Sequence, residues 1–113
     1  MALMEVNNDS AQWLIVWLEP LGEDRWLKRG EALQIRTDYV GDELAFGVLT
    51  HASEKDRADG IDNLSVYVER GHPMAVVTDR DGNVLECGHQ RPDEVDQRWK
   101  AQLAAMEEVN RTS

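Results

Sequence analysis

Hydrophobic and polar residues alternate along most of the chain with a period of two, which is typical of strands that bury one face. The clearest case is residues 31–37, where Leu33 and Ile35 fall on one side and Gln34 and Arg36 on the other. Comparable short segments are separated by glycine, proline and aspartate, the residues that favour turns. The pattern predicts seven strands, at residues 12–19, 25–28, 31–37, 43–50, 63–69, 74–78 and 84–87.

Near the C-terminus the period changes. Val95, Trp99, Leu103 and Met106 recur at spacings of three and four residues, which places them on one stripe of a helix. Asp93 is a suitable N-cap for that helix. The chain is therefore divided into a flexible lead over residues 1–11, a β domain over residues 12–90, and a C-terminal helix over residues 91–113 that packs on the domain.

Many short strands with turn residues between them are typical of an antiparallel sandwich or barrel. Strands and helices do not alternate repeatedly, so a parallel sheet is not expected. We predict a mainly β fold, namely a small antiparallel β-sandwich or barrel of about seven strands with one C-terminal amphipathic helix. Its core is expected to contain Leu14, Val16, Leu18, Leu33, Ile35, Leu44, Phe46, Val48, Leu64, Val66, Val68, Val76 and Leu85.

The first predicted strand is apolar on both faces, with Trp13, Ile15 and Trp17 on one side and leucines and a valine on the other. A strand of this kind needs cover on both sides. The second sheet covers one face. The C-terminal helix, through Trp99 and Leu103, is the expected cover for the other, and a partner molecule is the alternative.

Charge narrows the choice of partners. The 113 residues carry a formal charge of −10, which repels nucleic acid and anionic membranes and suits a basic protein partner. Half of that charge lies in residues 38–62, where seven carboxylates face two basic side chains. Binding residues collect on loops. We therefore expect this segment to contact the partner through Tyr39, Asp42, Glu43, Glu54, Asp56, Asp59 and Asp62.

Motifs for chemistry are weak. Cys87 and His89 are two residues apart at a strand end, and His51 and His72 could join them at a zinc or copper site, but the spacing matches no zinc finger. The sequence has no nucleophile elbow and no phosphate-binding glycine loop. The expectation is a protein without a cofactor, without a metal and without catalytic activity.

The leading hypothesis is a non-catalytic acidic protein-binding module, acting as bacterial toxin-neutralising (immunity) proteins or phage-encoded inhibitors do when they cover a basic surface. One alternative is an assembly subunit that forms a homo-oligomer, such as a homodimer, through the exposed part of the first strand. A further alternative is a metal- or small-molecule-binding protein that uses Cys87 and His89. The polar N-terminus does not resemble a signal peptide, so a cytoplasmic location is expected.

Overall fold

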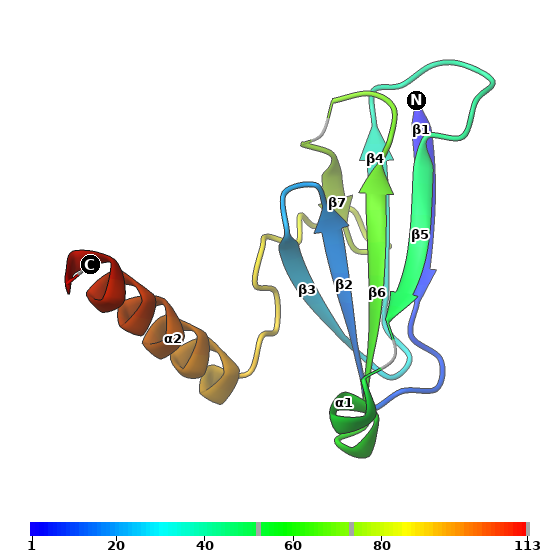
Figure 1. Cartoon of the computed structure of the whole chain (residues 1–113). Helices are drawn as coiled ribbons and strands as arrows, with labels where there is room; N and C mark the ends of the chain where they lie inside the picture. Colours follow the sequence, from blue (N-terminus) through cyan, green and yellow to red (C-terminus); the bar gives the residue numbers. More distant parts are fainter. Residues whose placement is uncertain (52, 73, 113) are drawn as a thin grey trace.

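Seven strands form two sheets that face each other, and a long helix extends away from one side of them (Figure 1). The computed structural model describes residues 1–51, 53–72 and 74–112. The three-stranded sheet has the order β1-β4-β7, and the four-stranded sheet has the order β3-β2-β6-β5. The strands are β1 (Ala2–Asn7), β2 (Trp13–Glu19), β3 (Glu23–Lys28), β4 (Ala32–Thr37), β5 (Phe46–His51), β6 (Ile61–Val68) and β7 (Val76–Thr78).

The predicted mainly β fold with a C-terminal helix is confirmed. One part of it was wrong, because β2 and β6 run parallel while the other named strand pairs are antiparallel. These two strands are far apart in sequence, and β4 between them belongs to the other sheet. Alternation within a strand indicates which face is buried, but it carries no information on the direction of a distant neighbour.

The predicted flexible lead is also a strand in part. β1 pairs along its whole length with β4, with Met4 opposite Ile35 and Val6 opposite Leu33. Val6 is buried and Met4 packs against the core. Met4 and Val6 alternate with the polar residues Glu5 and Asn7, so the signal was present, but it covers only these four residues.

At the other end of the β domain the predicted strands 74–78 and 84–87 form less regular structure than expected. Only Val76–Thr78 forms a strand, and residues 84–87 contribute one isolated bridge, between Thr78 and Val84. Val77 is buried whereas Val76 is exposed, so the inward face is shifted by one residue from the prediction.

The main core lies between the sheets. It contains Val6, Leu33, Ile35 and Val77 from one sheet and valines and leucines of β2, β3 and β6 from the other. Most of the predicted core positions belong to it or pack against it, but Leu44, Val48 and Val76 are exposed. Leu44 lies in the loop before β5 rather than in a strand, and Val48 lies on an edge strand.

A second, smaller core forms on the outer face of the four-stranded sheet. Helix α2 (Asp93–Thr112) begins there, with Val95 buried beside Ile15 and Trp26. The rings of Trp99 and Trp17 have centroids 5.8 Å apart, so the predicted contact of Trp99 with the first strand is confirmed. Leu103 is 58% exposed, and α2 extends away from the sheets (Figure 1).

A buried ion pair holds the start of α2 in place. Arg91 donates from Nε (2.9 Å) and Nη2 (2.5 Å) to the two carboxylate oxygens of Asp24, and Trp26 Nε1 donates to the same group at 2.7 Å. Burial by itself would raise the pKa of Asp24, but the hydrogen bonds from Arg91 and Trp26 outweigh it and the pKa lies below its ordinary value. The guanidinium of Arg91 also lies 4.8 Å from the Trp99 ring centroid.

Candidate interaction surface

Two of the four sheet edges are covered by the segment 79–91. Along β3, Trp26 N donates to His89 O (2.9 Å) and Gly88 N donates to Asp24 O (2.7 Å). Along β7, Leu85 N donates to Val77 O (2.9 Å). The backbone groups that these edge strands would otherwise present to solvent are thus partly satisfied from within the chain.

The other two edges, β1 and β5, are open. Among the described residues, the backbone hydrogen bonds of each strand reach only its one sheet neighbour, β4 for β1 and β6 for β5. Both edges lie on the same side of the sandwich (Figure 1), and residues of both line the same cavities.

The interior of the sandwich opens between these two edges. On β5 the residues Phe46, Val48 and Thr50 are opposite the inward-facing residues of β6, so they point between the sheets as well. Val48 is nevertheless 53% exposed, whereas Val66 directly opposite it is fully buried. We call this opening the β1–β5 seam, defined by the inward-facing residues Met4, Val6, Phe46, Val48 and Thr50.

Two cavities follow the seam. The first, of about 590 Å³, lies between the start of β1 and the start of β5 and is mainly apolar. Tyr39 and Glu43 contribute to its wall from the loop before β5. The second, of about 430 Å³, lies further along the same two strands and is more polar, with Arg57 and Asp62 at its wall.

The predicted binding residues are divided between the two ends of the seam. Tyr39, Asp42 and Glu43 belong to the loop before β5, whereas Glu54, Asp56, Asp59 and Asp62 lie on or just after α1 (Glu54–Ala58) (Figure 1). The six residues of β5 separate the two groups by roughly 17–20 Å. The segment 38–62 therefore forms two separate acidic groups, which we call the acidic rims. Within the second group Asp62 lines the seam cavity, while Asp56 lines a cavity on the outer face of β2, β6 and β5.

Residues of both rims form ion pairs or hydrogen bonds with neighbouring side chains. Glu43 forms an ion pair with Arg70, and its backbone N–H donates to the Tyr39 hydroxyl at 3.3 Å. At the other end Asn63 Nδ2 donates to the Asp56 carboxylate at 2.8 Å. Ser53 caps α1 by accepting from Asp56 N.

A polar cavity of about 600 Å³, which the sequence pattern did not predict, lies on the outer face of β2, β6 and β5. His51 Nε2 lies 2.6 Å from Ser65 Oγ, and Trp17 Nε1 donates to Asn63 Oδ1 at 3.0 Å. The signal was the polar alternation of Asn63 and Ser65 on β6, which faces outward. His51 pairs with Ser65 and Trp17 pairs with Asn63, and Ser65 is buried at the base of this cavity.

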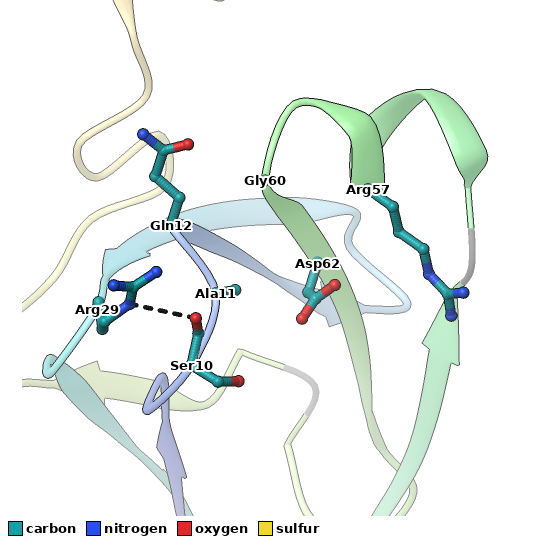
Figure 2. A pocket seen from close by; sticks show the side chains of 7 residues that line it. All are labelled: Ser10, Ala11, Gln12, Arg29, Arg57, Gly60 and Asp62. Carbon is teal, nitrogen blue, oxygen red and sulfur yellow. Dashed lines mark hydrogen bonds between the residues drawn. The ribbon is translucent and has the colours of Figure 1, made fainter.

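A further open pocket lies at the ends of the strands beside α1 (Figure 2). Arg29 and Arg57 stand on opposite sides of it and Asp62 lies between them. Arg29 Nε donates to Ser10 O at 3.2 Å. The pocket combines both signs of charge and is open to solvent.

The candidate metal ligands lie in separate surroundings. Cys87 Sγ is 3.8 Å from an oxygen of Asp24, His51 contacts Ser65, and His72 Nδ1 accepts from Met74 N at 3.1 Å. Within residues 1–51, 53–72 and 74–112, no three histidine, cysteine, aspartate or glutamate side chains form a group that could hold a metal ion.

The predicted oligomer interface on the first strand corresponds to β2. That strand is flanked by β3 and β6, and its outer face meets the start of α2, so it has no free edge.

In the part of the chain that the structure describes, no helix is both long enough and apolar enough to span a membrane. No protein-family model matches the sequence, and no curated protein or solved structure shows significant similarity to it.

Proposed function

We propose that this protein is a non-catalytic acidic binding module that covers a basic surface of a partner protein, as inhibitors and immunity proteins do. The observation that carries the proposal is the β1–β5 seam, where the inward-facing Val48 is exposed and Met4 and Phe46 are half-buried between the two acidic rims. Contiguous exposed apolar surface marks interaction sites in proteins that are otherwise well packed.

The apolar part of this surface is concentrated at one end of the seam. Val40 and Leu44 are each 82% exposed, and they line the same cavity as Leu3, Val48 and Tyr39. A partner side chain placed in this cavity would bury these residues, and Tyr39 has the large amphipathic ring that anchors many interfaces.

The negative charge of the acidic rims favours a basic partner. Carboxylates outnumber basic side chains in the segment 38–62 by seven to two, and the whole molecule carries −10. Such a surface steers a basic protein toward it and repels an acidic one. A partner that fits would present an apolar segment between two basic patches.

The test compares two variants with the same change in net charge. Asp56, Asp59 and Asp62 are replaced by Asn in one variant, and Asp93, Glu94 and Glu107 of α2 by Asn or Gln in the control. The partner is first isolated from the host on the immobilised protein and identified. Its association rate is then measured at two salt concentrations for wild type and both variants.

The rim variant should associate more slowly than wild type and show a weaker salt dependence, while the α2 variant should change both much less. Val48→Asp, which places a charge in the seam, should weaken binding by raising the dissociation rate. Equal rates and equal salt slopes for the two triple variants would contradict the proposal.

A second candidate is a subunit that associates with itself through α2. Beyond Trp99 the stripe of the helix continues with Leu103 and Met106, which are 58% and 62% exposed. Sizing chromatography coupled to light scattering tests this candidate directly. A dimer that Leu103→Asp with Met106→Asp converts to a monomer would support it, and a monomer at every accessible concentration would exclude it.

A further inference from the structure

We infer that the partner binds as an extended strand along the free edge of β5, adding a fifth strand to the β3-β2-β6-β5 sheet. This inference rests on the proposed function and specifies how the seam is used. Extended segments add to exposed sheet edges in several known recognition modes, with main-chain hydrogen bonds giving affinity and alternate side chains giving selectivity.

The backbone of β5 is oriented for this. Glu69 N donates to Ala45 O at 2.9 Å, and these residues lie opposite each other when the β5–β6 register is extended by one pair. In an antiparallel ladder, residues that bond to the neighbour alternate with residues that point away from it. The N–H and C=O groups of Phe46, Val48 and Thr50 therefore point toward the free edge.

The side chains of β5 leave this edge unprotected. The strand FGVLTH has no proline, lysine or carboxylate, and Val48 and Leu49 are both about half exposed. Natural proteins usually protect edge strands with charges, prolines, bulges or a covering segment. β3 and β7 have a covering segment, and β1 carries Glu5, which pairs with Arg80.

A bound strand would place every second side chain in the seam, beside Phe46 and Val48, because side chains alternate between faces. Those positions call for apolar residues. The other side chains would lie over Leu49 and His51 on the outer face. Basic residues fit at both ends, near Glu43 and near Asp62.

Charge favours a basic partner strand over a second copy of the same chain. Two copies paired through β5 would bring two molecules of charge −10 together, with the rims of each beside the other. Like charges at close range oppose such a contact, while a lysine- or arginine-containing strand is attracted.

The probe is an acetylated, amidated peptide in which lysine and valine alternate over eight residues. Its control is a peptide of the same composition with four valines followed by four lysines, which cannot place valine on one face only. Both are titrated into the ¹⁵N-labelled full chain at low salt while amide shifts and amide hydrogen exchange are followed by NMR. The variant pair is Thr50→Pro, which removes an outward N–H, and Thr50→Ala, which keeps it.

The alternating peptide should shift and protect the Val48 and Thr50 amides, and the control peptide should bind at least several-fold more weakly. Thr50→Pro should weaken binding about tenfold, because a backbone hydrogen bond is lost and the proline ring obstructs the edge, whereas Thr50→Ala should stay within about twofold of wild type. Proline is tolerated at such an outward-facing edge position. If Thr50→Pro does not fold, the protection of the wild-type amides and the weakening by Val48→Lys decide the question.

Strand addition is excluded if the peptide does not bind, if it shifts other surfaces, or if Thr50→Pro binds as well as Thr50→Ala. It is also excluded if β5 amides become protected on concentrating the protein alone, since a second copy then occupies the edge. A different result would contradict the proposed function itself, namely that the partner's association rate does not change when the acidic rims are neutralised. If the partner's binding is weakened by neutralising the rims but not by Thr50→Pro, the proposed function stands and strand addition at β5 is wrong.

Discussion

The two sides of the sandwich differ in how far their strand edges are covered by the rest of the chain. On the side of β3, the segment 79–91 covers the strand edge, Arg91 and Asp24 form a buried ion pair, and Trp99 packs on Trp17. On the side of β5, the edge is bare and the space between the sheets reaches the surface. The first side is built for stability, while the second retains apolar surface and free backbone groups that a partner can use.

Because of this difference, we expect mutations on the β3 side to affect folding and mutations on the β5 side to affect binding. Residues on the β3 side have their partners within the chain, so a change there should lower the free energy of unfolding. Val48 and Thr50 at the open edge of the seam are exposed, so a change there should leave folding almost intact, whereas Val6 of the same seam belongs to the core.

The largest effect is expected from Arg91→Ala. The side chain of Asp24 is only 3% exposed, and removing Arg91 leaves a buried carboxylate without its cation. Loss of one partner of a buried ion pair typically costs about 3–5 kcal/mol. Arg80→Ala is the control, because Arg80 and Glu5 are largely exposed and such pairs contribute about 0–1 kcal/mol. Urea unfolding of both variants measures the difference, and similar losses would show that the buried pair contributes no more than the exposed one.

The next largest effect is expected at Val66 of β6, compared with Val48, the residue paired with it in β5. Val66→Ala should cost about 2 kcal/mol, because Val66 is fully buried and its truncation leaves a cavity. Val48→Ala, at the paired position in β5, should change the free energy of unfolding by less than about 0.5 kcal/mol. The same urea titration tests both variants. A comparable loss for Val48 would mean that the seam is closed in solution.

A smaller effect is expected on the free energy of unfolding at low pH. The pKa of Asp24 is lower in the folded chain than its ordinary value of 3.8. The stability that this shift contributes is therefore complete at pH values above 3.8 and is lost as the pH falls through the folded-state pKa. The gap in unfolding free energy between wild type and Arg91→Ala should narrow as the pH is lowered below 3.8. A constant gap would show that Asp24 ionisation is not coupled to folding.

The smallest effect is expected from shortening α2. A chain that ends at Lys100 keeps Val95 and Trp99, which are the helix residues that pack on the sheet. Its free energy of unfolding should fall by less than about 0.5 kcal/mol, since exposed residues contribute little. A chain that ends at Pro92 should lose more and expose Trp17. Thermal unfolding followed by tryptophan fluorescence separates the two, and an equally large loss for the longer chain would mean that residues 101–113 also support the fold.

The sequence determined the class of fold and most of the buried positions. The alternation of Leu33 and Ile35, and the two apolar faces of residues 13–18, directly reflect which side chains must leave water, and both predictions were confirmed. The apolar stripe with Trp99 also predicted the cover of β2. Such patterns are local, and the hydrophobic effect acts on each strand or helix in the same way wherever it lies.

Only the tertiary structure decided the parallel pairing of β2 with β6, the inclusion of β1 in a sheet, and the opening at β5. Val48 and Val66 have the same local pattern, yet one is half exposed and the other buried. Alternation tells which way a side chain points but not whether another strand lies beside it. The order of strands in the sheets left β1 and β5 at the open edges, and it divided the acidic segment 38–62 between the two ends of the seam.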